Sequence, residues 1–463
     1  MNKTDLRALD SALERYVYAL FAGLGRVERR VSMRWYVAGL LLDGERKSIQ
    51  PMAARLVDTS ADAEAMRQRL QEAVVSANWD DREVRARLAT HVGRELPDLE
   101  MLVVDDTGFP KKGKKSPGVA RQYSGTMGRI DNCQVAVSVH VAGVKGSAAL
   151  GFRLYLPEAW ANDPVRRKAA HIPDEVVFKT KWEIALDEID AVRAAGVRQE
   201  IVGADAGYGE VQEFREALAN RSLRYVVRVP SSPVVWRPGE GPIPPWERPY
   251  SRGKGRPPTR YIDGEARPVT VAGLANELGS AGASSVTWAE GTSGPKTAQF
   301  GAVRVRTAHR HEAGHPPGAE EWLLYEWLPD GEPRLWLSNL PADTALTDLV
   351  RLAKLRWRIE RDYQEMKGEC GLDHYEGRTW RGFHHHATLC MVAHAFLATQ
   401  RAHFPPERPT VDASHGPGAP SGRSPAPDRD LRGLWSTHAG NHPRVVSGPA
   451  TGAPVNNNPE PIR

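Results

Sequence analysis

The stretch VVDDTGFPKKGKK, residues 103–115, places two aspartates at the end of an apolar run and a lysine-rich loop directly after them. The run LEMLVVDD, residues 99–106, predicts a buried strand. Successive side chains of a strand point to opposite faces of the sheet, so Asp105 and Asp106 should lie on different faces. The sequence thus sets carboxylates at a strand end beside a dense positive charge.

The segments that follow predict a mixed sheet. Residues 132–143 and 149–157 have the pattern of strands, residues 173–197 that of a helix, and residues 200–209 that of a strand ending in glycines. A helix over 211–221 and a strand over 224–230 complete the series. Three consecutive strands favour an antiparallel meander, and the later helix–strand alternation favours parallel pairing. The predicted fold class is therefore α/β.

Changes of composition along the chain predict five regions. Residues 1–95 should form a helical N-terminal domain, 96–230 the first part of the core, 231–343 a β-rich insertion, 344–404 the final helices, and 405–463 a disordered low-complexity tail. Within the first region, residues 47–74 could form a helix-turn-helix-like DNA reader or an ordinary packed helix pair.

Composition limits the class of protein. Lys and Arg number 62 against 57 for Asp and Glu, so a polyanionic partner is compatible with the charge. Cys133, Cys370 and Cys390 lie far apart, which argues against a disulfide framework or a structural zinc site. No secretory signal or membrane-spanning run is evident, and we expect a cytoplasmic protein without a membrane partner.

Three acidic residues fall where strand ends and a helix face can bring them together. Asp106 closes the first strand, Asp205 closes the fourth, and Glu360 lies in the helical segment LRWRIERDYQEMK. On a continuous helix Arg356, Glu360 and Lys367 share an arc of about 60° with Tyr363. Asp105 is the alternative to Asp106, because the register of the strand is not fixed by the sequence.

Carboxylates without His or Cys suit Mg²⁺ or Mn²⁺. Two such ions in one active site can activate a water or hydroxyl and stabilise the leaving oxygen of a phosphodiester. Cations beside them would hold DNA phosphates, and the candidates are Arg356, Lys367, Lys111, Lys112, Lys114 and Lys115.

The sequence resembles the DDE transposases of bacterial insertion sequences over about residues 10–400. The resemblance rests on DDTGFPKKGKKSPGVARQYSGTMG, ADAGYG and GLDHYEGRTWRGFHHH, and on Arg356, Glu360 and Lys367 at the spacing of the family's signature. The signature's tyrosine is replaced by Ala353. The resemblance implies a ribonuclease H-like fold with a β-rich insertion, and Asp106, Asp205 and Glu360 as ligands of two metal ions.

The resemblance also implies the partners. They are the terminal inverted repeats of the element and a target DNA, with a homodimer joining two ends, in a bacterial cytoplasm near the nucleoid. Two other interpretations remain open. One is a DNA-binding relative that has lost catalysis; the other is a phosphotransferase with a nucleophilic aspartate at the strand end.

Two further groups of residues stand out. His384, His385 and His386 point in different directions on a helix, so we expect DNA-facing or surface positions rather than a metal site. The tryptophans of the insertion are expected mainly in its core, and one could stack on a DNA base.

Overall fold

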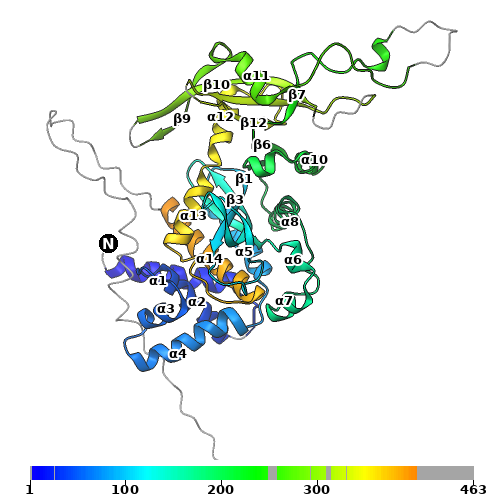
Figure 1. Ribbon diagram of the computed structural model, residues 1–463. Coiled ribbons are helices and arrows are strands. Elements are labelled where there is room, and N and C mark those ends of the chain that lie inside the picture. The colour runs from blue at the N-terminus through cyan, green and yellow to red at the C-terminus, as the bar shows by residue number, and fades with distance from the viewer. Residues whose placement is uncertain are drawn as a thin grey trace, which may run out of the picture.

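A computed structural model describes residues 3–25, 27–248, 258–291, 294–308, 314–329 and 331–403. Residues up to Glu95 are helical. The helices are α1 (Lys3–Leu20), α2 (Val27–Leu41), α3 (Ile49–Leu56), α4 (Ser60–Gln71), the π turn η1 (Glu72–Ser76) and α5 (Asp81–Glu95). In Figure 1, α1 to α4 lie in the lower part of the molecule, and α5 lies higher, beside the sheet. α3 and α4 pack together, which is compatible with both a helix-turn-helix-like reader and an ordinary packed helix pair.

The central part is a mixed sheet. Its strands are β1 (Leu99–Pro110), β2 (Ala120–Ser124), β3 (Arg129–Gly143), β4 (Ser147–Leu154), β5 (Ile201–Ala204) and β6 (Arg224–Val229). β3 pairs antiparallel with β1 and β4, whereas β5 pairs parallel with β1 and β6. The predicted mixed α/β class is confirmed.

Helices link these strands. They are α6 (Glu158–Ala161), α7 (Pro164–Ala169), α8 (Lys181–Ala194), α9 (Ala206–Gly209) and α10 (Gln212–Asn220). The predicted start of the long helix at residue 173 is wrong. α8 begins at Lys181, because Thr180 and Glu183 form a reciprocal capping box at its N-terminus. The preceding segment is instead held by Arg167, which donates to the carbonyls of Pro173 and Val176.

The strands between residues 234 and 338 extend the same sheet. They are β7 (Val234–Trp236), β8 (Val269–Thr270), β9 (Ser284–Gly291), β10 (Gly294–Thr307), β11 (Glu320–Trp327) and β12 (Arg334–Ser338), with helix α11 (Val271–Leu278) and the short 3₁₀ turns η2 (Pro245–Glu247) and η3 (Ser280–Gly282). β12 pairs antiparallel with β6, so the sheet of the described residues has 12 strands. Figure 1 shows these later strands at the upper end.

Three helices complete the described chain: α12 (Leu346–Leu355), α13 (Arg358–Gly368) and α14 (Trp380–His403). The expectation of one continuous helix through Arg356 and Lys367 is wrong, because the chain turns at Arg356 and Trp357 between α12 and α13. The apolar spacing continues across the turn, so the sequence pattern does not reveal it. The predicted tail lies outside the described residues.

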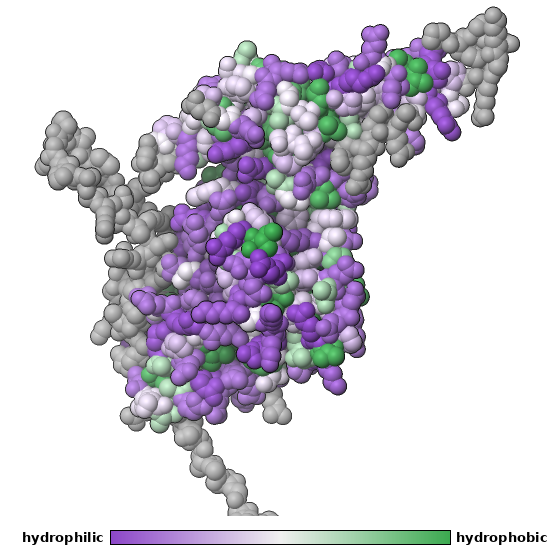
Figure 2. Space-filling view, in the orientation of Figure 1, coloured by the Kyte–Doolittle hydropathy of each residue, from purple (hydrophilic) through white to green (hydrophobic). Residues whose placement is uncertain are grey.

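Buried ion pairs join the N-terminal helices to the sheet. Arg85 of α5 pairs with Glu188 of α8, which also accepts from Arg153 of β4 at 2.8 Å. Among the described residues, no helix combines the length and apolar character needed to cross a bilayer. The face in Figure 2 is mostly hydrophilic, with scattered hydrophobic groups.

Candidate active site

The two aspartates of β1 lie on different faces of the sheet. Val103 packs in the apolar cluster that contains α12 and the start of α13, whereas Val104 packs in the cluster that contains α8. By the alternation of a strand, Asp105 continues the face toward α13 and Asp106 the face toward α8. The Lys181 ammonium at the start of α8 accordingly lies 2.8 Å from the Asp106 carboxylate.

Arg356 lies between the carboxylates of Asp105 and Glu360. Its Nη1 donates to Asp105 Oδ2 at 2.7 Å, and its Nη2 donates to Glu360 Oε1 at 2.9 Å. The turn between α12 and α13 sets the guanidinium between the two carboxylates. The Asp105 side chain is 15% exposed and that of Glu360 is 50% exposed, so the glutamate faces solvent.

Asp205 follows the end of β5, beside Asp105 in the middle of β1; the expectation that the first strand closes at Asp106 is wrong, because β1 stays paired with β3 as far as Pro110. The register pairs Val104 of β1 with Ala204 of β5, and the aspartates are the next residues of each strand. Neighbouring strands lie about 4.8 Å apart, and residues in parallel register point to the same face. Asp205 also caps α9, where its Oδ1 accepts from the Tyr208 backbone N–H at 3.3 Å.

The electrostatics agree with a crowded carboxylate site. Burial and the charge of Asp205 raise the pKa of Asp105 to about 7, although Arg356 opposes the shift. Burial and repulsion from Asp106 likewise raise the pKa of Asp205. The charges of both aspartates of β1 therefore act on this site, and Asp105 is the one that Arg356 contacts. Such a cluster favours a cation.

Two tyrosines border the carboxylates. The Tyr208 side chain is buried, and its hydroxyl has no hydrogen-bond partner among the described residues. Burial and the charges of Asp106 and Asp105 raise the pKa of Tyr208, which keeps the phenol protonated. The Tyr363 hydroxyl instead lies 2.6 Å from Ser138 Oγ. Tyr208 thus presents a donor that nothing in the described protein uses.

The predicted phosphate-binding cations lie at different places in the structure, and not all of them are near the carboxylates. Lys367 lies near the end of β1, where its Nζ donates to Gly108 O at 2.9 Å and to Thr126 Oγ1 at 3.2 Å. Lys111 Nζ donates to Tyr375 O at 2.9 Å. Lys112, Lys114 and Lys115 are exposed in the loop beyond. Only Arg356 contacts the carboxylates directly, so the structure does not gather all six cations into one site.

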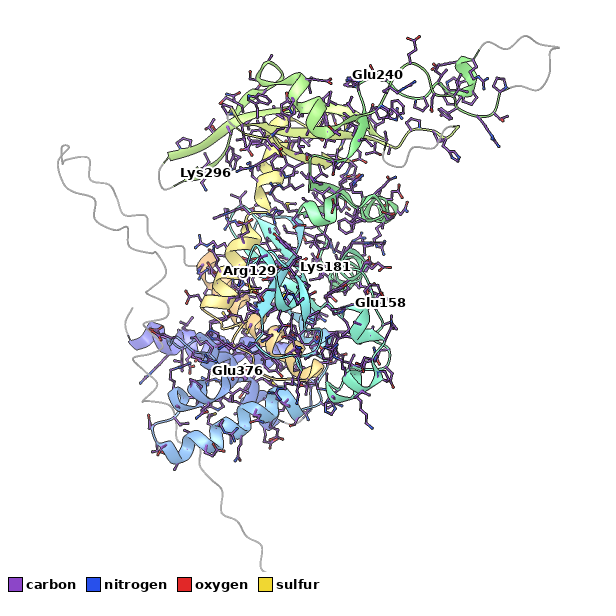
Figure 3. All side chains as sticks on the ribbon, in the orientation of Figure 1. Arg129, Glu158, Lys181, Glu240, Lys296 and Glu376 are labelled. Carbon is purple, nitrogen blue, oxygen red and sulfur yellow. The ribbon has the colours of Figure 1, made fainter. Side chains whose placement is uncertain are left out.

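Three basic or aromatic residues near the site escaped the sequence analysis. Lys181 pairs with Asp106, and Figure 3 shows it beside the strands of the core. Arg228 lies on β6 near Arg356. Burial is the first cause that lowers the pKa of Arg228, and the charge of Arg356 is the second. Trp357, in the turn after Arg356, is 52% exposed. An uninterrupted helix pattern gives no signal for an exposed tryptophan at that turn.

The expectation that the three histidines of α14 are surface residues is wrong. All three are buried. His385 faces the carbonyls of Val74 and Trp79 at 2.9 Å from its two ring nitrogens, and His386 Nδ1 lies 2.9 Å from the Tyr36 hydroxyl. His385 and His386 fasten α14 to the N-terminal region, whereas His384 Nε2 accepts from the Leu154 backbone N–H of β4 at 3.2 Å.

The tryptophans of residues 231–343 were expected mainly in the core of the insertion, and only some of them are buried. Trp236 and Trp336 are buried, whereas Trp246 is 74% exposed. The Lys354 ammonium lies 4.7 Å from the ring of Trp288 and 5.5 Å from that of Trp336. Trp288 and Trp336 therefore pack around a partly buried cation.

Comparison with known proteins assigns the chain a family. The family described as DDE superfamily endonuclease matches residues 19–295. That range contains Asp105, Asp106 and Asp205 and ends before Glu360. The chain is also 30% identical over 208 residues to a protein of Microchaete diplosiphon named as a probable transposase for insertion sequence element IS701. The matched region is 44% of this chain and 50% of that relative, so the chain spans about half of the relative's length.

Proposed function

The chain belongs to the DDE superfamily endonucleases, and from this we propose that it is a transposase that cuts and joins DNA at the ends of an insertion sequence. One observation carries the proposal. The parallel register of β1 and β5 sets Asp105 beside Asp205, and Arg356 links Asp105 to Glu360. In this proposal, residues from three separated parts of the chain contribute to one carboxylate site on two interior strands of the sheet, which solvent reaches on the side of the half-exposed Glu360.

We propose Asp105, Asp205 and Glu360 as the metal ligands. Asp106, which the sequence favoured as first ligand, is paired with Lys181 on the other face and fits the role less well. The donors are all carboxylate oxygens, which suits two Mg²⁺ or Mn²⁺ ions. Ions bound there would activate the attacking water or 3′-hydroxyl and stabilise the leaving oxygen.

The described residues have the oxygen ligands that such ions prefer, but the carboxylates are not yet positioned around a common ion. In the portion of the chain with described placement, no three His, Cys, Asp or Glu residues already stand as a metal-binding group. Arg356 occupies the position between Asp105 and Glu360 and neutralises both. The half-exposed Glu360 must therefore turn from Arg356 to share a cation with Asp105. The unused hydroxyl of Tyr208 can donate to a carboxylate or water in that arrangement.

The remaining parts of the proposal follow from the family resemblance and from charge. Arg356, once released from Asp105, is placed to hold a DNA phosphate, and Lys367 stabilises the end of β1 beside it. The substrates are the terminal inverted repeats of the element and a target DNA. Two ends require two active sites, so a homodimer is the proposed active form. We place the protein in the cytoplasm near the nucleoid, with residues 1–95 contributing to end binding.

The proposed domain division follows the sequence. Residues 96–230 and 344–404 would form a ribonuclease H-like core, interrupted by the strands of 231–343. The order β4–β3–β1–β5–β6 of the sheet supports this division.

The test is nicking and strand transfer on a plasmid that carries the element's own ends, with Mg²⁺ or Mn²⁺. The native protein is expected to cut at the ends, and Glu360→Gln to bind them without cutting. Glu210→Gln, an exposed carboxyl just after α9, is the matched control and is expected to cut normally. Binding without cutting by the native protein under every metal would identify an inactive DNA-binding relative. A phosphoryl group trapped on an aspartate would identify a phosphotransferase.

A further inference from the structure

A groove lies between the lysine loop after β1, the segment before α14 and the α2–α3 connection. Its volume is about 750 Å³. Its cations are Arg46, Lys111, Lys112, Lys114, Lys115 and Arg378. We call it the basic groove. Figure 3 labels Glu376, one of its residues, near the junction of the N-terminal helices and the core.

Most of these cations have no internal role. Arg46 pairs with Glu376, and Lys111 donates to the Tyr375 carbonyl. The other four, Lys112, Lys114, Lys115 and Arg378, have no acidic partner within the described parts of the chain. Asp373 and Glu376 also line the groove, so its six cations exceed its two carboxylates by four, and a polyanion is the occupant of complementary charge.

Hydrogen bonds hold the walls of the basic groove in place. The segment before α14 is fixed on both sides, because His374 Nδ1 accepts from the Lys47 backbone N–H at 3.0 Å and Tyr375 O accepts from Lys111. A second hollow shares Arg46, His374 and Glu376 with the groove and continues over α3 and α4. One surface therefore runs from the lysine loop to α3 and α4.

The strand β1 sets the distance from this groove to the carboxylates. Lys111 follows Asp105 by six residues along an extended strand that ends at Pro110. At about 3.3 Å per residue, the two lie about 20 Å apart. Duplex DNA rises about 3.4 Å per base pair, so this distance corresponds to about six base pairs.

We propose that the basic groove holds the phosphate backbone of the duplex that is being cut, about six base pairs from the scissile bond, and directs that duplex onto α3 and α4 of the same subunit. The inference rests on the proposed function and adds a second DNA contact that is separate from the carboxylates. Duplex DNA is the occupant that fits, because an evenly spaced row of phosphates can meet several lysines at once.

The test uses a duplex bearing the element's end, bound by the Glu360→Gln protein so that the DNA stays intact. Phosphate ethylation is expected to block binding about six base pairs from the bond that the native protein cuts. The combined variant Lys112→Ala, Lys114→Ala, Lys115→Ala is expected to lose this interference. Its plot of log affinity against log salt should be less steep by about 2.7, or 0.9 for each lost phosphate contact.

The matched control removes three exposed cations that do not line the groove: Lys145→Ala, Lys168→Ala, Arg224→Ala. It should keep the interference pattern and the salt dependence. If the triple-lysine variant behaves like this control, the groove does not bind the duplex and the inference fails. Equal losses on the element end and on an unrelated duplex, without interference near the cut, would also overturn it. A native protein that neither binds nor cuts the ends would instead overturn the proposed function.

Discussion

Arg356 donates to Asp105 at 2.7 Å, and through its other terminal nitrogen it holds Glu360 at 2.9 Å. This contact favours Asp105 over Asp106, the first ligand that the sequence had favoured. Asp106 has a partner of its own, Lys181, on the face toward α8. Substitutions at Asp105 and Asp106 are therefore expected to have different effects on DNA cutting.

Asp105→Asn should reduce DNA cutting by at least about a hundredfold, equal to about 2.7 kcal/mol of transition-state stabilisation, because it removes a proposed metal ligand. Asp106→Asn should leave most of the activity, since it removes only a partly exposed ion pair worth less than about 1 kcal/mol. Cutting of plasmid ends with Mn²⁺ measures both. An inactive Asp106→Asn beside an active Asp105→Asn would return the ligand role to Asp106.

Much of this site could be predicted from local pattern. The buried run before Asp105, the small residues around Asp205 and the position of Glu360 all carry sequence signals, and in the structure Arg356 links Asp105 to Glu360 while Asp205 follows the strand paired with β1. The face of each aspartate could not be predicted, because alternation gives opposite faces without saying which face meets α13. The turn at Trp357 was hidden because the apolar spacing of α12 continues into α13.

The histidines of α14 show a second limit of sequence reasoning. A helix that is buried on all sides has no polar stripe from which to tell inside from outside. Of the three, His385 is buried because the carbonyls of Val74 and Trp79 lie within reach of its ring nitrogens. Those partners are more than 300 residues away in the chain, so local pattern could not supply them.

Arg356→Ala should make the protein respond more strongly to a divalent cation. Without the guanidinium, Asp105 and Asp205 repel each other with less compensation, and a bound cation relieves the repulsion. The rise in melting temperature on adding Mn²⁺ should exceed that of the native protein by at least about 2 °C. Calorimetric scans without DNA measure this.

Arg351→Ala is the control for that experiment, since Arg351 of α12 pairs with Glu100 and Asp348 away from the carboxylates. Its response to Mn²⁺ should equal that of the native protein. An unchanged response in Arg356→Ala would mean that the carboxylates do not bind the ion.

Asp362→Ala should destabilise the protein by about 3–5 kcal/mol. The Asp362 carboxylate is buried, and it accepts from His140 Nδ1 and from Ser147 Oγ, both at 2.7 Å. Removing it leaves two buried polar groups of the sheet unpaired. It also removes the hydrogen bonds that hold α13, the helix that carries Glu360, against the sheet. Urea unfolding measures the loss, and Asp348→Ala, at an exposed position, should change stability by less than about 0.5 kcal/mol. A loss that small in Asp362→Ala would show that this network contributes little to holding α13.

Acid should destabilise the protein through His386. Burial lowers the pKa of His386 to about 4, against about 6.5 in the unfolded chain. Because the folded pKa lies below the unfolded one, the unfolded state binds the proton first as pH falls, and stability is lost between about pH 6.5 and 4. At pH 5 the loss from this residue should be about 2 kcal/mol.

The ring itself gives the sharper measurement, because other groups also titrate in this range. Nuclear magnetic resonance of the labelled imidazole should find His386 still neutral at pH 5, with Nε2 donating to Gly371 O and Nδ1 accepting from Tyr36. If the ring of His386 instead takes up its proton near pH 6.5 in the folded protein, it is open to water, and the packing of α14 against α2 does not hold in solution.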